Sequence, residues 1–168
     1  GPHQGPDLAD LPHARRRVKS ALALASRSCQ APRLCAKLRG VTRLSPGIHY
    51  FTPTLSIHVF DAPEPGPTAL IQAGIHGDEV AGVHALQELL EENIRPARGR
   101  LIVVPIMNPP AYRARQRCAP GGLDLNRCFP GDADDPASER RLARRFMDLV
   151  LAERPALMAT LHESHKRY

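Results

Sequence analysis

Apolar and polar residues recur along most of this chain with periods that predict strands and helices. Residues 47–51 and 55–60 are typical of two strands, and Pro53 separates them. In the second run, every other position from Leu55 to Val59 is a branched aliphatic residue. This alternation predicts a strand with one better-buried face.

Three later runs, at residues 68–73, 101–106 and 156–161, are almost entirely apolar. The first two are typical of buried strands that are covered on both faces in a parallel sheet, and the third is predicted to be a last apolar strand. Between them, apolar residues at helical spacing predict one helix over 78–94 and a second over 135–154. Asp135 should be the N-cap of the second helix. The buried face of that helix is predicted to comprise Leu142, Phe146, Leu149 and Val150.

The order of these elements predicts an α/β fold. We expect a mixed, largely parallel central sheet with helices on both faces and an antiparallel edge formed by the early strands. A flexible segment, residues 1–12, should precede one domain over 13–168, with helices near 13–27 and 32–38. Residues 108–133 have no apolar period, and connections of this length are usually functional or disordered.

Composition narrows the classes of function. The 168 residues carry a net charge of +6, and 42% of them are hydrophobic without any run long enough to cross a membrane. Aromatic residues make up only 4% and tryptophan is absent, so platforms for stacking nucleic-acid bases are scarce. The basic charge favours a small anionic substrate, and we expect neither a nucleic-acid nor a membrane partner.

The four cysteines include no Cys-x-x-Cys pair, which argues against a zinc site made of thiolates. Cys118 and Cys128 flank one glycine-rich loop, where they either form a disulfide or remain free thiols. Free thiols are typical of cytoplasmic proteins, and the cytoplasm is the location we expect.

Residues 74–79, Gly-Ile-His-Gly-Asp-Glu, join an apolar strand to a helix and carry two side chains that bind metals. His76 lies in the turn after the strand, and Glu79 is predicted in the first helical turn, so both can reach one ion. His162 follows another strand, and ligand sites in open α/β sheets lie beyond the carboxyl ends of strands. Two histidines and one carboxylate are ligands of hydrolytic zinc enzymes, although each residue alone is also typical of a protein surface. His165 is a weaker alternative ligand.

Arginines crowd the long connection, at positions 113, 115, 117 and 127. Arg127 follows Asn126 within an Asp-Leu-Asn-Arg string that is flanked by Gly-Gly and Pro-Gly pairs. Arginine binds a carboxylate through a planar two-pronged fork, and a neighbouring asparagine can add a donor. This segment therefore either binds a carboxylate or is a solvated basic loop.

Four strings in order, AGIHGDEVAG, NPPAYRARQR, GGLDLNRCFPG and TLHES, resemble the succinylglutamate desuccinylase/aspartoacylase family of the zinc carboxypeptidase superfamily. The resemblance covers roughly residues 68–165. It implies a zinc carboxypeptidase-like fold and a zinc-dependent hydrolase, or deacylase, that cleaves the amide of N-acyl amino acids. In the wider superfamily it implies a carboxypeptidase that acts on peptide C-termini.

Position by position, the resemblance implies one Zn²⁺ per chain, held by His76, Glu79 and His162. It also implies that Asn126 and Arg127 bind a carboxylate of a small anionic amide or peptide substrate.

A third role implied by the resemblance is catalytic. Arg117 matches the arginine that polarises the scissile carbonyl, and Arg115 is the alternative in a shifted register. Tyr112 and Asp124 match positions that look structural.

The sequence departs from the family in one respect. The family's general-base glutamate lies on a strand well beyond the third zinc ligand, whereas six residues follow His162 here. Glu163 adjoins that ligand, but neighbours on a strand point to opposite faces. We therefore expect that the C-terminal part is missing, that a second chain completes the site, or that the protein is a non-catalytic zinc-binding module. In each case this chain alone should hydrolyse little substrate.

Overall fold

The structure, a computed structural model, describes residues 42–163 of the 168. The segment expected at 1–12 and the helices expected at 13–27 and 32–38 lie outside this range. Within it, no helix is both long enough and apolar enough to cross a membrane.

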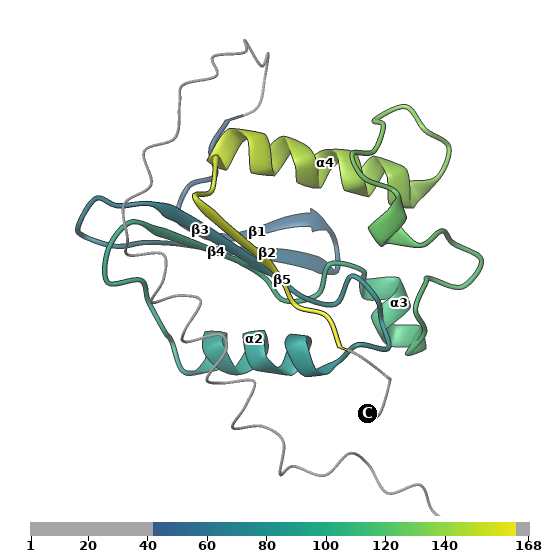
Figure 1. The fold of residues 1–168 in the computed structure, drawn as a ribbon, viewed down its shortest axis with the longest axis horizontal. Helices are drawn as coiled ribbons and strands as arrows, with labels where there is room; N and C mark the ends of the chain where they lie inside the picture. The colour runs from purple at the N-terminus through teal and green to yellow at the C-terminus, as the bar shows by residue number, and fades with distance from the viewer. Residues whose placement is uncertain (1–41, 164–168) are drawn as a thin grey trace, which may run out of the picture.

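Five strands form one mixed sheet in the order β1-β2-β4-β3-β5 (Figure 1). Their bounds are β1 Gly47–Thr52, β2 Leu55–Asp61, β3 Thr68–Gln72, β4 Arg100–Val104 and β5 Leu157–Thr160. β3 pairs in parallel with β4 and β5, whereas β2 pairs antiparallel with β1 and β4. Among these strands β2 alone runs against the others. The predicted mixed, largely parallel sheet with an antiparallel edge is therefore confirmed.

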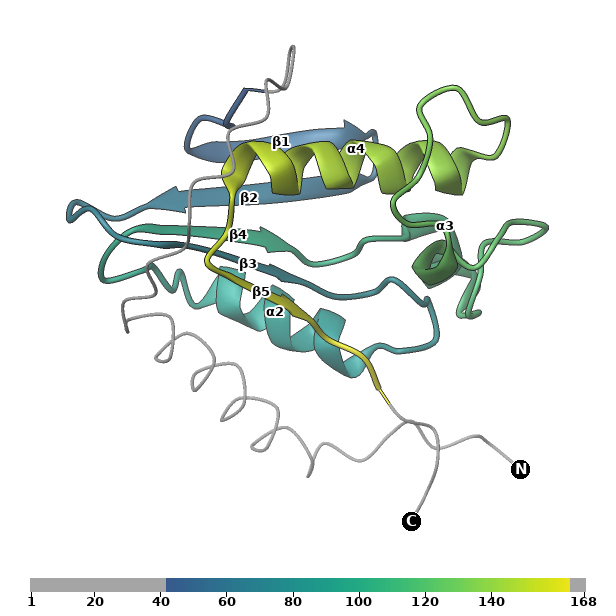
Figure 2. The same cartoon turned by 45° about the horizontal axis from the view of Figure 1, so that its top comes forward.

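Two helices cover opposite faces of this sheet, as predicted. α2 (Ala81–Glu91) lies on one face and α4 (Ser138–Glu153) on the other, as Figures 1 and 2 show. Leu86 of α2 and Phe146 of α4 are both fully buried, each in a separate apolar cluster. The sheet is thus the middle of three layers, which explains why β3 and β4 are buried along their whole length.

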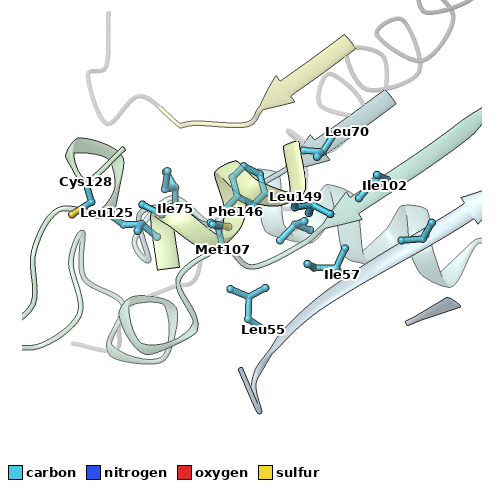
Figure 3. Packing of buried hydrophobic residues seen from close by; sticks show 13 residues of the cluster. Leu55, Ile57, Leu70, Ile75, Ile102, Met107, Leu125, Cys128, Phe146 and Leu149 are labelled. Atoms are coloured by element: carbon cyan, nitrogen blue, oxygen red, sulfur yellow. The ribbon is translucent and has the colours of Figure 1, made fainter. Parts of the chain in front are cut away.

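The larger apolar cluster lies between α4 and the sheet (Figure 3). It contains the alternating residues of β2, which are the fully buried Leu55, Ile57 and Val59. On α4, Phe146 and Leu149 are buried, and Leu142 and Val150 pack half-buried against the same cluster. The predicted buried faces of both elements are confirmed.

α2 begins at Ala81 rather than at Asp78 as predicted. Residues 76–79 form a turn of their own, in which the Glu79 N–H donates to the His76 carbonyl at 3.4 Å. The chain has to reverse after β3 before a helix can run back along the sheet. Glu79 therefore lies in the turn before α2, and its predicted place in the first helical turn is wrong.

The connection at 108–133 contains two short helices. They were not predicted, because this segment has no apolar period. These are α3 (Pro109–Ala114) and the 3₁₀ helix η2 (Leu125–Arg127). Asn108 caps α3, because its Oδ1 accepts from the Ala111 N–H at 3.3 Å. Both helices are too short to show a periodic face, although Asn followed by proline is a local signal of a helix start.

The start of α4 also differs from the prediction. The N-cap is Ala137, which has an extended backbone conformation and makes no capping hydrogen bond through its side chain. Asp135 instead closes a local turn, in which its Oδ1 accepts from the Ala137 N–H at 2.9 Å. The prediction of Asp135 as the N-cap is therefore wrong, because its carboxylate is used before the helix begins.

An ion-pair network centred on the buried Arg100 fastens the carboxyl end of β2 and the amino end of β4 to the end of α4. Nη1 of Arg100 donates to both carboxylate oxygens of Glu153, at 3.1 and 3.0 Å, and Nε and Nη2 donate to Asp61 at 2.7 and 3.0 Å. Glu153 also accepts from the Leu44 N–H at 2.7 Å. These contacts lie at the amino ends of the parallel strands. His76 lies at the other end of the sheet, beyond the carboxyl end of β3.

Candidate metal centre

The loop after β3 is tied to the loop after β4. The N–H of Ala73 donates to the Val104 carbonyl at 3.0 Å, and the carbonyl of Gly74 accepts from the Asn108 N–H at 2.9 Å. Gly74 has a φ of +63°, which glycine adopts without strain. These hydrogen bonds fix the turn that follows the carboxyl end of β3 and that contains His76.

Gly77 lets this turn lie directly against α3. A Cβ at this position would lie 2.0 Å from the backbone carbonyl carbon of Ala111, so only glycine fits. The Gly77 N–H donates to the carbonyl of Gln116 at 3.0 Å. The His76 turn and the segment that leads to Arg117 are therefore packed as one unit.

Three side chains from distant parts of the chain meet at the carboxyl ends of β3 and β5. Ligand atoms of His76, Glu79 and His162 all lie within 4.8 Å of one another. Nδ1 of His76 lies 2.8 Å from Oε1 of Glu79, and Nδ1 of His162 lies 2.7 Å from Oε2. Within residues 42–163, no other such group of histidine, cysteine or acidic side chains is present.

Both ring nitrogens of His76 face carboxylate oxygens, because Nε2 lies 3.2 Å from Oδ1 of Asp124. A neutral imidazole has only one N–H and can donate to only one of them. A cation between Nδ1 and Glu79 would resolve this, since Nδ1 would offer its lone pair while Nε2–H donates to Asp124. Metal-binding histidines usually donate their second N–H to a carboxylate in this way. The donor set therefore fits a metal ion such as zinc.

The carboxylates of Glu79 and Asp124 are both held in the charged form. Burial alone would raise the pKa of Glu79, but hydrogen bonds from His76, the Glu163 N–H and His162 outweigh it, so the pKa is lowered. Burial would likewise raise the pKa of Asp124, and the hydrogen bonds from Arg117 and His76 lower it. Both residues are therefore anions at neutral pH, as a cation site requires.

Asp124 connects the three candidate ligands to the arginine-rich segment. Its Oδ2 accepts from Nε and Nη2 of Arg117 at 3.1 and 3.0 Å, and its Oδ1 accepts from the Asn126 N–H at 3.0 Å. The ion pair with Asp124 raises the pKa of Arg117. Sequence reasoning gave Asp124 only a structural place, and the contact with His76, 48 residues away, was missed.

The residues expected to bind substrate lie around this carboxylate. Arg117 is half-exposed, and Arg127 is 83% exposed with its Nε 3.9 Å from Oδ2 of Asp124. Asn126 is exposed on η2. Arg115, the alternative to Arg117, ends α3 in a left-handed conformation and is exposed. The structure thus joins Arg117 to the candidate ligands through Asp124 and leaves the side chains of Asn126 and Arg127 open to solvent.

Cys118 and Cys128 are free thiols, so the disulfide alternative is not formed. Cys128 is buried beneath η2, and its Sγ donates to the carbonyl of Asp124 at 3.3 Å. Burial raises the pKa of this thiol, which keeps it protonated. Its contact with Asp124 helps to fix the position of η2.

Two histidines and a glutamate thus lie at the carboxyl ends of parallel strands in an α/β sheet, and this arrangement could hold one metal ion. The model of the succinylglutamate desuccinylase/aspartoacylase catalytic domain matches residues 65–165. The chain belongs to this family, whose wider superfamily of zinc carboxypeptidase-like proteins implies zinc.

Individual relatives agree with the family. The chain is 48% identical over 77 residues to N-alpha-acetyl-L-2,4-diaminobutyric acid deacetylase of Halomonas elongata, which covers 45% of this chain and 22% of that protein. It is 37% identical over 93 residues to succinylglutamate desuccinylase of Burkholderia pseudomallei, covering 54% of this chain and 26% of the relative. The chain therefore spans about a quarter of the length of these curated relatives.

The fold agrees as well. An aspartoacylase family protein from Mesorhizobium loti superposes with a TM-score of 0.60 at 29% identity, covering 80% of this chain and 44% of that structure. The zinc carboxypeptidase-like α/β fold that the sequence predicted is thereby confirmed.

Proposed function

We propose that this chain carries the metal site of a zinc-dependent amide hydrolase, a deacylase that acts on N-acyl amino acids or similar carboxylate-bearing amides. The observation that supports this most directly is the meeting of His76, Glu79 and His162 around a shared carboxylate, with Asp124 on the second nitrogen of His76. Its membership of a family that includes a deacetylase and desuccinylases favours the same reaction class.

One zinc ion per chain would be held by Nδ1 of each histidine and the carboxylate of Glu79. When bound, zinc supplies a water of lowered pKa and a Lewis acid for the scissile carbonyl. Glu79 is buried and anionic, so it offers the negative charge that offsets part of the ion's charge. Asp124 fixes the ring of His76 by accepting from Nε2, which orients Nδ1 toward the ion.

The arginines would bind and orient the substrate. Arg127 and Asn126 lie on one exposed helical turn, where the guanidinium fork and the amide can take a substrate carboxylate. Arg117 would stabilise the charge that develops on the carbonyl oxygen, and Asp124 holds its guanidinium in place. A carboxylate held by Arg127 would place the amide of a small substrate over the metal, since both arginines contact or approach Asp124.

Two measurements test this proposal. Calorimetric titration of zinc-loaded protein with N-acetyl- and N-succinyl-amino acids should show binding that Arg127→Lys weakens by about 1.5–3 kcal/mol, because lysine keeps the charge but loses the fork. Arg113→Lys, an exposed arginine of α3, is the matched control. Equal affinity in wild type and Arg127→Lys, with metal retained, would rule out this carboxylate site.

Turnover separates the proposed deacylase from its alternatives. The protein should be assayed against N-acyl amino acids and against short peptides with free C-termini. Both substrate classes present a carboxylate to Arg127, so binding alone does not distinguish them. Faster hydrolysis of the peptides would favour a carboxypeptidase. Because this chain alone is expected to hydrolyse little substrate, the residual rates on the two classes are compared. Metal and ligand binding without any residual turnover of either class would favour a binding module.

A further inference from the structure

We propose that Glu163 is a positioning residue for the candidate metal ligand His162. It anchors the β5 segment, which is β5 together with the three residues that follow it (161–163), to the first turn of α2. This inference rests on the proposed metal site. It addresses how His162, 83 residues away from Glu79 in the chain, is kept within 2.7 Å of that carboxylate.

His162 lies where the sheet no longer holds the chain. The last paired residue of β5 is Thr160, opposite Gln72, and the Leu161 N–H makes one more bond, to the Gln72 carbonyl at 2.9 Å. The side chain of His162 is 37% exposed, whereas that of His76 is 3% exposed. A ligand on an exposed segment beyond a strand needs another anchor if its position is to be fixed.

Glu163 makes two hydrogen bonds that supply this anchor. Its backbone N–H donates to Oε2 of Glu79 at 3.1 Å, and its own Oε2 accepts from the Ala81 N–H at 3.2 Å. Ala81 is the first residue of α2, whose N-cap Val80 makes no side-chain cap and whose first turn has no acidic residue. Glu163 thus brings a side-chain acceptor to a helix whose N-cap residue supplies none.

Gly82 provides an independent sign that the β5 segment is docked on α2. A Cβ at this position would lie 2.7 Å from Cβ of Leu161 and 3.3 Å from Cβ of Ala73. Glycine inside a helix is less favourable than alanine. Here it allows the helix to approach Leu161 closely. The contacts of Leu161 and Glu163 with α2 therefore flank His162 on both sides.

The anchor also explains the direction of the Glu163 carboxylate. Its Oε2 is bound to the start of α2, and only its backbone N–H reaches the ligand Glu79. We therefore assign Glu163 to holding His162 and not to accepting a proton from the attacking water.

Zinc affinity tests the inference. The dissociation constant of the 168-residue chain should be measured by competition with a chromophoric chelator for wild type, Glu163→Ala and Glu163→Gln. Glu163→Ala should weaken zinc binding about 10-fold, the lower end of the range for losing an outer partner of a ligand, because Glu163 acts on His162 only through the backbone. Glu163→Gln should restore most of the affinity, because its amide oxygen still accepts from the Ala81 N–H. Glu91→Ala, an exposed glutamate at the other end of α2, should bind zinc as wild type does.

A comparison of backgrounds shows whether Glu163 acts through His162. In a His162→Ala background, adding Glu163→Ala should cause no further loss of zinc affinity. In a His76→Ala background, the same addition should still weaken binding. Equal losses in both backgrounds would indicate a general loosening of the structure and would overturn the inference. Gly82→Ala, which displaces Leu161 by another route, should weaken zinc binding as Glu163→Ala does.

The outcomes separate this inference from the proposed function. Wild-type affinity in both Glu163→Ala and Gly82→Ala, together with weak binding by His162→Ala, would overturn the anchor and leave the metal site standing. Wild-type affinity in His162→Ala would overturn the metal site and the anchor together. The visible spectrum of the cobalt-substituted protein gives a second readout, and it should shift in Glu163→Ala but not in Glu91→Ala.

Discussion

Removal of the Asp124 carboxylate should weaken metal binding although Asp124 is not itself a proposed ligand. Its side chain is 18% exposed and accepts from His76 Nε2 at 3.2 Å, from the Asn126 N–H at 3.0 Å, and from two nitrogens of Arg117. Only the bond with His76 leads to the metal. Loss of such a partner typically costs 10–100-fold in metal affinity, which is about 1.4–2.7 kcal/mol.

We expect Asp124→Ala to fall in the lower half of this range, about 10–30-fold, because 3.2 Å is at the long end for an N–H···O bond. Asp124→Asn should lose less affinity, since its amide oxygen can still accept from His76 Nε2. Its NH₂ group cannot accept from Arg117, so ligand binding should suffer more than metal binding. The assay is chelator competition for zinc, with thermal unfolding of the metal-free protein as the control for folding. Unchanged zinc affinity in a folded Asp124→Ala protein would refute this reasoning.

Three further predictions concern metal content and stability. Protein purified without added metal should contain about one divalent ion per chain, and His76→Ala should contain much less; equal metal content by elemental analysis would exclude His76 as a ligand. Glu153→Ala should lower the free energy of unfolding by about 1–3 kcal/mol in urea titrations, because the buried Arg100 loses one of its two carboxylate partners while Asp61 stays bound to it. Burial lowers the pKa of His58 from 6.5, so the unfolded chain binds its proton more tightly. Stability should therefore fall as the pH drops below about 6.5, and His58→Gln should show a smaller fall.

Much of the fold could be predicted because it depends on local patterns. The almost entirely apolar runs of β3 and β4 predict strands that are covered on both faces, and the alternation from Leu55 to Val59 predicts one buried face. His76 and His162 follow β3 and β5, so both histidines could be expected beyond the carboxyl ends of strands in one sheet. The structure brings His76 and His162 together there with Glu79, and their role as metal ligands stays a prediction.

Short elements and exact helix starts could not be predicted in this way. α3 and η2 have too few residues for a hydrophobic period, and their starts depend on single capping bonds from Asn108 and Asp124. The start of α2 at Ala81 depends on the turn that the chain needs after β3. Such choices are decided by one or two hydrogen bonds, which weigh little in a pattern averaged over a window of residues.

The sequence by itself determined which segments form the apolar layers and which ordered motifs the protein carries. Both are local features, because each depends on residues that are close together in the chain. Only the tertiary structure decided which polar side chains share a partner. Asp124 reaches His76 across 48 positions and Glu163 reaches Ala81 across 82, and both contacts exist only after the sheet has formed. A hydrogen bond between distant segments requires its donor and acceptor to be placed to within a few tenths of an ångström. The spacing of residues along the chain does not specify that placement.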